Sequence, residues 1–310
     1  MQEPLESNCH VGLVHPMAFP ECVSGEGPIM ETLERIATDT FFSAVEVTRM
    51  KDAAVRKQAS HLLAVSGLDV IFAAAPALRQ EKLSLCDTSQ AGRKKAVDFG
   101  KVLIDQAYEL GASIMVVASG PDPGEAERAA AAAAFTDSLK QLCADAQEKA
   151  GATMLSISVE NFDRTMDKRM LIGPTREAAE IVAAVYAECS NVGLTIDLSH
   201  QALLRESVQD MVLTAVDYLI HVHIGNCVVS DPAHPAYGDR HPRFGCPGGE
   251  VGVEELKRFL ESLIYGGYFK KSVPTTMPVV SFEVRPMAGE RSEWVIANAK
   301  RALRQAWARL

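Results

Sequence analysis

The 310-residue chain lacks an apolar stretch approaching the roughly 20 residues that a membrane-spanning helix needs. It also lacks a basic run. With 31 basic and 40 acidic residues its net charge is −9, so it is a poor candidate for binding nucleic acid or an anionic membrane. Its seven cysteines are scattered without a Cys-x-x-Cys pair, which argues against a disulfide or zinc-thiolate framework. Residues 1–6 are acidic and unlike a targeting signal, so we expect a soluble, cytoplasmic protein.

Two motifs of common α/β enzymes are also missing. No G-x-G-x-x-G occurs in residues 12–20, after the first apolar run, which argues against a doubly wound dinucleotide-binding sheet. No G-x-S-x-G occurs anywhere, so the nucleophile elbow of a serine hydrolase is absent. No glycine-rich phosphate cradle follows the last apolar run, which favours an unphosphorylated ligand.

What the sequence does contain is a regular alternation of short apolar runs and longer amphipathic segments. The runs predict strands at 11–14, 44–47, 69–73, 113–118, 153–159, 193–197, 218–223 and 279–284. The segments predict helices at 29–38, 53–66, 91–110, 125–149, 175–189, 202–215, 253–263 and 290–307. Continuous apolar strands suit a parallel sheet covered on both faces. Eight such units predict an α/β protein with one (β/α)8 TIM-barrel domain over residues 1–310.

Polar residues stand at the ends of four successive predicted strands. Glu160 ends the fifth, Asp197 the sixth, His223 the seventh and Glu283 the eighth. Active sites of such barrels lie at the carboxyl ends of the strands, and buried carboxylates need a compensating charge. We therefore predict that these four side chains bind one divalent cation. His221, one pleat deeper than His223, is expected to be structural.

The predicted ligands are three carboxylates and one imidazole, with no thiolate. Hard oxygen donors favour Mn²⁺, with Mg²⁺, Co²⁺ and Zn²⁺ as alternatives.

These residues resemble the xylose isomerase-like TIM-barrel superfamily of sugar isomerases and epimerases, above all its ketose 3-epimerase branch. The resemblance covers nearly the whole chain and includes Val45-Glu46-Val47, Leu110-Gly111-Ala112 and Asp197-x-x-His200. It implies that Glu160 and Glu283 also form the acid/base pair, and that His200 contacts substrate oxygens. Such a pair moves a proton at the carbon next to a carbonyl, through an enediolate that the metal stabilises.

Further substrate contacts are expected around the same face. Residues 227–249 form an extended loop after the seventh strand, rich in polar side chains, which predicts either a lid or a subunit contact. In it, Arg240 and Arg243 are candidates for binding a sugar oxygen or a carboxylate. Arg285 shares the inward face of its strand with Glu283. The remaining candidates are His15, after the first strand, and Glu46, after the second.

The leading hypothesis is a metal-dependent sugar isomerase or epimerase that acts on a small sugar. One alternative keeps the barrel but makes it a lyase that cleaves a 3-keto glycoside or C-glycoside. Another is a non-catalytic sugar-binding partner subunit. The endonuclease IV-like branch of the superfamily would need more histidine ligands and a basic surface, which the net charge of −9 opposes. The resemblance further implies a homodimer or homotetramer.

Overall fold

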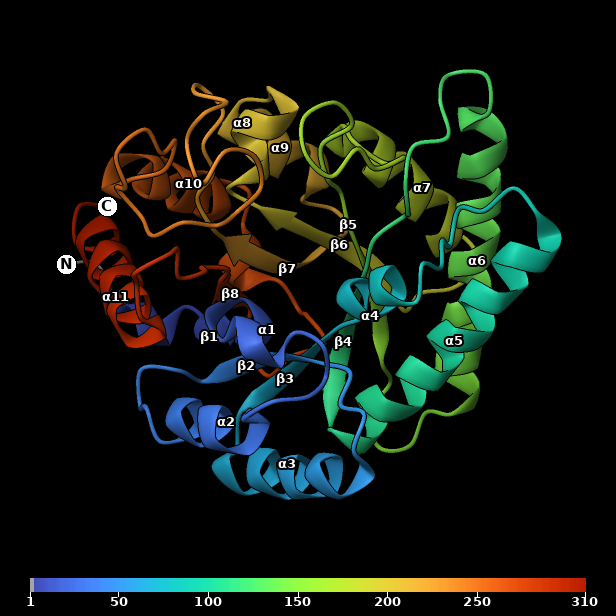
Figure 1. Ribbon diagram of the computed structural model, residues 1–310, viewed down its shortest axis with the longest axis horizontal. Coiled ribbons are helices and arrows are strands. Elements are labelled where there is room, and N and C mark those ends of the chain that lie inside the picture. The colour runs from blue at the N-terminus through green and yellow to red at the C-terminus, as the bar shows by residue number, and fades with distance from the viewer. Residues whose placement is uncertain (1–2) are drawn as a thin grey trace.

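The alternating pattern folds into a closed barrel in the computed structural model, which describes residues 3–310. The strands pair in chain order, all parallel, and the last pairs with the first (Figure 1). They are β1 (His10–Val14), β2 (Ala44–Thr48), β3 (Asp69–Ala73), β4 (Ala112–Val117), β5 (Ser156–Glu160), β6 (Val192–Asp197), β7 (Leu219–Ile224) and β8 (Val279–Phe282). The predicted (β/α)8 barrel is confirmed.

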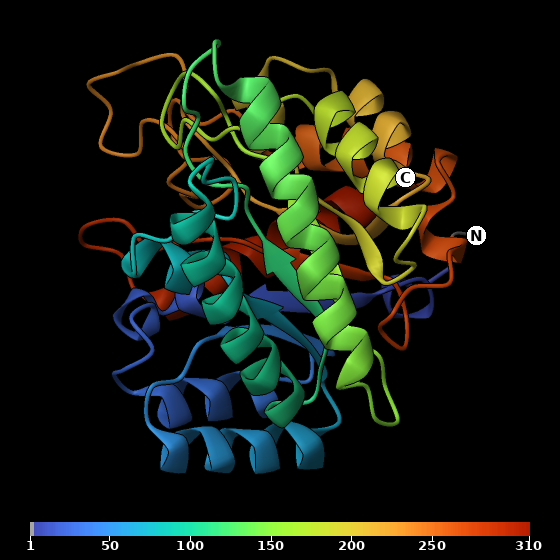
Figure 2. The ribbon, with the colours of Figure 1, turned by 90° about the vertical axis from the view of Figure 1, so that its right-hand side faces the viewer.

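Helices surround the barrel and cover the outer face of its sheet (Figure 1). Neighbouring helices pack side by side, most visibly α5 with α6 and α2 with α3 (Figure 2). The helices are α1 (His15–Ala18), α2 (Ile29–Ala37), α3 (Ala53–Ser66), α4 (Ala75–Gln80), α5 (Gln90–Glu109), α6 (Arg128–Glu148), α7 (Thr175–Tyr186), α8 (His200–Leu204), α9 (Val208–Ala215), α10 (Val253–Tyr265) and α11 (Ser292–Trp307).

One segment that was predicted to form a single helix forms two helices in the structure. The segment 202–215 forms two helices, α8 and α9, because Arg205 adopts a left-handed conformation with φ of 59°. Ser207 then caps α9 by accepting a hydrogen bond from the backbone nitrogen of Asp210 at 3.0 Å. The short helices α1 and α4, directly after β1 and β3, were not predicted, since they are too short to show a helical period.

Apolar side chains fill two separate regions. The larger one lies between the sheet and the helices, and the smaller one is made by inward-facing side chains of four strands. The smaller region consists of Ala44, Ile71, Ile114, Val116 and Val279. Gly12 belongs to the same crowded interior, since a Cβ there would lie 2.3 Å from Ser281 Oγ. This part of the barrel interior is therefore closely packed, and a cavity opens at the carboxyl ends of the strands.

The carboxyl ends of the strands face one side of the molecule, where the longest loops gather. In Figure 2 the loop after β7, in orange, and the loop after β8, in red, project on this side. Within residues 3–310, no helix has the length and apolar character to cross a bilayer.

Candidate metal centre and substrate cavity

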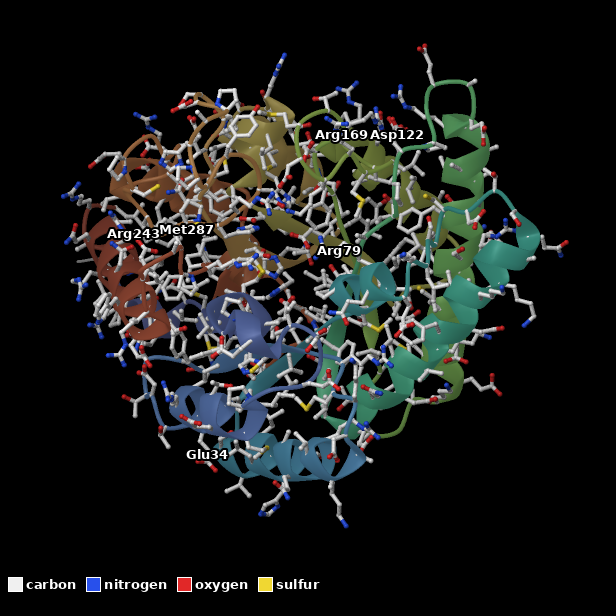
Figure 3. All side chains as sticks on the ribbon, viewed as in Figure 1. Glu34, Arg79, Asp122, Arg169, Arg243 and Met287 are labelled. Carbon is white, nitrogen blue, oxygen red and sulfur yellow. The ribbon has the colours of Figure 1, made fainter. Side chains whose placement is uncertain are left out.

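A cavity of about 360 Å³ opens at the carboxyl ends of the strands. Both buried acidic and imidazole groups and basic side chains line this cavity. The basic residues are Arg79, Lys168, Arg240 and Arg285. Arg79, on α4, lies near the middle of the barrel mouth in Figure 3. The cavity thus combines buried acid/base groups with cationic side chains that can bind the oxygens of a polar ligand.

Three of the four predicted metal ligands meet in this cavity, and we call them the first ligand group. His223 Nδ1 lies 3.2 Å from Glu160 Oε1 and 2.9 Å from Glu283 Oε2. One ligand atom from each of the three residues falls within 4.8 Å of the others. Apart from this contact with His223, the buried Glu283 Oε2 has no polar partner among the described residues. Such a cluster of buried oxygen and nitrogen donors fits a divalent cation.

Asp197, the fourth predicted ligand, lies beside this group rather than within it. It is the direct neighbour of His223 in the pairing of β6 with β7. Its carboxylate accepts hydrogen bonds from the backbone nitrogen of Ser199, at 2.9 Å, and from the Ser199 hydroxyl. Its Oδ2 faces two other histidines, His200 and His241, at 3.7 Å and 3.6 Å. The predicted convergence of all four ligands is therefore only partly seen.

Glu46 fixes the orientation of the central histidine. His223 donates from Nε2 to Glu46 Oε2 at 2.7 Å, which leaves its Nδ1 facing Glu160 and Glu283. His221, fully buried, also lies with Nε2 3.1 Å from Glu46 Oε2. Burial alone would raise the pKa of the Glu46 carboxyl, but the two imidazoles hold it at about 2. Glu46 is thus an ionised acceptor that orients His223, the central residue of the candidate metal site.

Replacing Glu46 with glutamine is expected to weaken cation binding about 10- to 100-fold, because the neutral amide no longer stabilises the required imidazole orientation. Isothermal titration of the metal-stripped protein with Mn²⁺ measures the change. Glu34→Gln, the same substitution on the exposed surface of α2 (Figure 3), is the matched control. Unchanged affinity in the Glu46 variant would contradict this role.

The two glutamates of the first ligand group differ in their proton affinity. Burial raises the pKa of Glu160 to about 7, and the nearby Glu283 charge adds to this against the opposing effect of His223. Burial also acts to raise the pKa of Glu283, but the imidazoles of His241 and His223 lower it below its usual value. At neutral pH, without a bound cation, Glu160 is therefore partly protonated and Glu283 ionised. Two carboxyl groups with separated pKa values can act as acid and base.

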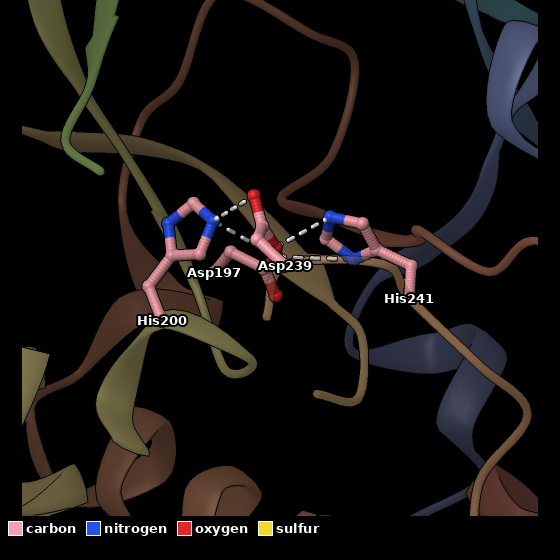
Figure 4. A group of neighbouring side chains, drawn as sticks. All are labelled: Asp197, His200, Asp239 and His241. Atoms are coloured by element: carbon pink, nitrogen blue, oxygen red, sulfur yellow. Dashed lines mark ion pairs between the residues drawn. The ribbon is translucent and has the colours of Figure 1, made fainter. Parts of the chain in front are cut away.

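A second ligand group adjoins the first and consists of Asp197, His200, Asp239 and His241 (Figure 4). All four side chains are buried. Asp239 and His241 line the cavity, whereas His200 is not among its lining residues, so its predicted contact with substrate oxygens is not seen in this position. Sequence analysis noted Asp239 and His241 only as polar residues of a long loop. The Asp-x-His spacing of Asp239 and His241 was the sequence feature that could have indicated a pair of side chains with a shared role.

The extended loop after β7 is anchored along its length. Gly238 donates its backbone N–H to Val228 O at 2.8 Å, and Glu250 donates to Cys227 O at 2.9 Å. Arg285, after β8, donates to the carbonyl of His241 at 2.7 Å. Because residues 236–242 are mostly buried and Arg285 donates to one of their carbonyls, this part of the segment belongs to the wall of the site. The lid and the subunit contact both stay predictions.

The predicted substrate-binding arginines divide between the cavity and the rim. Arg240 and Arg285 line the cavity. Arg243 is not among its lining residues: its Nε lies 3.1 Å from Glu290 Oε1, and in Figure 3 it stands at the rim near Met287. The structure therefore gives Arg243 a surface ion pair in place of the expected substrate contact.

His15 also lies outside the cavity lining. It is 2% exposed, and its Nε2 lies 2.8 Å from the hydroxyl of Thr32 on α2. Burial lowers the pKa of His15 to about 3, so the ring is neutral. Its contacts are those of a hydrogen-bonded core histidine, and its predicted role in substrate binding finds no support in this position.

The sequence model described as the xylose isomerase-like TIM barrel matches residues 35–276. No curated protein sequence matches the chain. Among solved structures, D-psicose 3-epimerase from Clostridium cellulolyticum H10, determined with D-tagatose, is 18% identical with a TM-score of 0.66, and the match covers 96% of each chain.

Two further structures match over almost their whole length. The 3-keto-D-glucoside 4-epimerase from E. coli is 15% identical, with a TM-score of 0.66 over 95% of this chain and 98% of that one. The IolI protein, determined with a bound zinc atom, is 14% identical, with a TM-score of 0.71 over 97% and 98%. At these identities the likeness establishes a common fold.

Proposed function

Because the chain belongs to the xylose isomerase-like TIM barrel family, we propose that it is a divalent-metal-dependent sugar epimerase or isomerase. The observation that carries this proposal is the position of Glu160 and Glu283. They come from β5 and from the end of β8, yet both lie beside His223 Nδ1, at 3.2 Å and 2.9 Å. Two carboxyl groups on one cavity are what proton transfer at a single carbon requires. Structural neighbours named as sugar epimerases support the substrate class.

Glu160, His223 and Glu283 hold the cation in this proposal, with Asp197 completing the set from the neighbouring strand. The oxygen-rich donor set favours Mn²⁺. When bound, the cation polarises a carbonyl and hydroxyl pair, so that the adjacent C–H becomes more acidic.

The two glutamates then divide the proton transfer between them. In this proposal Glu283 is the carboxylate that removes the proton, and Glu160, on the same cavity beside His223, is the group that returns a proton to the enediolate. Return to the opposite face of the same carbon is epimerisation, and return to the neighbouring atom is isomerisation. Arg240 and Arg285, on the cavity wall, orient the sugar oxygens.

Cleavage of a 3-keto glycoside is a second candidate function, favoured by the space next to the cavity. A further cavity of about 490 Å³ is bounded partly by the same side chains, Arg79, Lys168 and Met170. Apolar residues such as Leu83 and Leu85 line its other side. This space accommodates a group larger than one sugar ring, such as the aglycone of a glycoside.

An assay of the Mn²⁺-loaded enzyme against ketoses, aldoses and 3-keto glycosides tests both functions. Interconversion of sugars with uptake of solvent deuterium at one carbon is the expected result. Release of an aglycone without interconversion of sugars would show that the protein is a lyase and contradict the epimerase or isomerase function. Tight binding without turnover of any sugar would contradict both and favour a sugar-binding subunit.

A further inference from the structure

The cavity of about 490 Å³ beside the substrate cavity, which we call the side cavity, shares part of its wall. Glu160, His223 and Glu283 border only the substrate cavity. A ligand that extends from one space into the other would therefore keep its reacting carbon near the glutamates and place a different group in the side cavity. The residues that line both spaces are Ala75, Arg79, Ala118, Asp167, Lys168 and Met170.

Three segments of the chain form the side cavity, and backbone hydrogen bonds join them. They are the end of α4 with the turn after it, the loop after β4 and the loop after β5. Cys86 donates its backbone N–H to Ser119 O at 3.1 Å. Leu171 donates in the same way to Gly120 O at 2.9 Å. The fold itself therefore holds the walls of this cavity in place, which lowers the entropic cost of binding a ligand there.

Apolar side chains form much of the lining of the side cavity. A sugar ring, with a hydroxyl group on almost every carbon, would leave hydroxyls without hydrogen-bond partners against such walls. An apolar ring or chain gains free energy there through the hydrophobic effect. The lining therefore suits an apolar substituent of a sugar better than a second sugar. Its apolar residues include Leu78, Leu83, Leu85, Pro121 and Met170.

The charged side chains of the same lining carry an excess of positive charge. Three of them are basic, Arg79, Lys82 and Lys168, and Asp167 is the acidic one among them. Lys168 is already paired, with its Nζ 2.8 Å from Asp239 Oδ2 and 3.3 Å from Asp167 Oδ2. Arg79 and Lys82 have no ion-pair partner within residues 3–310. In a chain of net charge −9, two unpaired cations at an apolar cavity indicate a ligand with an anionic group.

The backbone at Lys82 has a conformation that favours glycine. Its φ is 54°, in the left-handed region, directly after Glu81 at the end of α4. The Leu83 N–H bonds to Leu78 O at 2.9 Å. The Lys82 N–H bonds to Arg79 O at 3.1 Å, which completes a Schellman motif. Any side chain is strained at this position relative to glycine, and strain of this kind is typical of residues with a function in binding.

We propose that the side cavity binds an apolar ring that carries a carboxylate, with the ring against the leucines and the carboxylate paired with Arg79 and Lys82. This inference rests on the proposed function and names its substrate class: a sugar derivative whose acidic, apolar substituent occupies the side cavity. The planar guanidinium of Arg79 suits a carboxylate, which it can bind through two parallel hydrogen bonds. A phosphate ion has no apolar part and would leave the walls unoccupied.

The test measures the binding of a small probe and needs no turnover. The probes are 2-naphthoate and its uncharged amide, 2-naphthamide, which share one ring system and differ in charge. Isothermal titration uses the metal-stripped protein, so that the carboxylate cannot coordinate a cation at the candidate metal site. We expect 2-naphthoate to bind about tenfold more tightly than the amide, because charge-assisted hydrogen bonds are roughly twice as strong as neutral ones.

Two variants place the probe in the side cavity. Lys82→Gly removes one charge and suits the left-handed backbone, so this variant should keep the fold. We expect it to weaken 2-naphthoate binding about fivefold, and Arg79→Gln about tenfold, with the affinity for 2-naphthamide unchanged. Lys57→Gln removes the same charge from the exposed surface of α3 and should bind both probes like the unaltered protein.

Equal affinities for the two probes would overturn the proposal, as would an unchanged affinity for 2-naphthoate in both variants. Displacement of 2-naphthoate by an equal concentration of inorganic phosphate would identify a phosphate site and overturn it too. Absence of 2-naphthoate binding refutes this inference even if sugars are turned over, and the proposed function then stands. Binding as expected without turnover of any sugar by the Mn²⁺-loaded protein would refute the proposed function and leave the side-cavity site standing.

Discussion

Glu160→Gln is expected to lower sugar turnover about a thousandfold, because a glutamine amide neither carries nor accepts the transferred proton at neutral pH. The side chain lies beside His223 Nδ1 and is almost fully buried, so an amide of nearly equal volume should leave the barrel intact. Steady-state kinetics of the Mn²⁺-loaded variant measure the loss. Deuterium uptake from heavy water, which reports proton transfer directly, should fall in parallel.

A weaker cation site would also reduce turnover, so the two effects must be separated. Bound Mn²⁺ is measured in the same preparation, and kinetics are taken with the cation in excess. The matched control is Glu188→Gln, at a surface ion pair with Lys140. Full activity in Glu160→Gln at saturating Mn²⁺ would show that Glu160 does not transfer the proton.

Asp197→Asn is expected to weaken cation binding by about 100-fold, since even the loss of an outer partner costs 10- to 100-fold. The reason is its position next to His223, where it completes the proposed ligand set. An asparagine oxygen can still accept from the backbone of Ser199, so the local turn should persist. Affinity for Mn²⁺ and turnover are both measured, and both should fall together.

The comparison with two other variants makes this result informative. His223→Ala, which removes the central ligand, should lose the cation altogether. Asp98→Asn, in an exposed ion pair with Lys94 on α5, should keep the affinity of the unaltered protein. Unchanged affinity in Asp197→Asn would show that the Asp197 carboxylate is a structural acceptor for Ser199 only.

The barrel fold and the placement of acidic residues at the carboxyl ends of its strands were predictable, because both depend on local periodicity in the sequence. Glu160 and Asp197 are the last residues of β5 and β6, and Glu283 directly follows β8. A carboxylate after a continuous apolar run is an anomaly that sequence alone reveals, and parallel strands bring such residues to one end. The pairing of His221 and His223 on one face followed from the same two-residue period.

What could not be predicted depends on contacts between distant segments. Asp239 and His241 lie in an irregular loop, and no period shows that such residues turn inward. Their burial depends on Lys168, 71 residues earlier, and on Arg285, after the last strand. The hydrogen bond between His15 and Thr32 could not be predicted for a related reason, since Thr32 lies on a helix whose position against the barrel the strand pattern does not specify.

The distribution of the site along the chain has a consequence for how its specificity can change. Every residue of both ligand groups lies between Glu160 and Glu283, in the half of the barrel that starts at β5. The first half contributes Glu46 and much of the remaining wall of the cavity, including Met17, Val23 and Arg79. All members of both ligand groups thus lie in one half of the polypeptide, whereas the wall of the cavity is shared by both halves. We expect substitutions around α1 and α4 to alter which ligand the cavity binds and to leave the clustered acidic and imidazole groups in place.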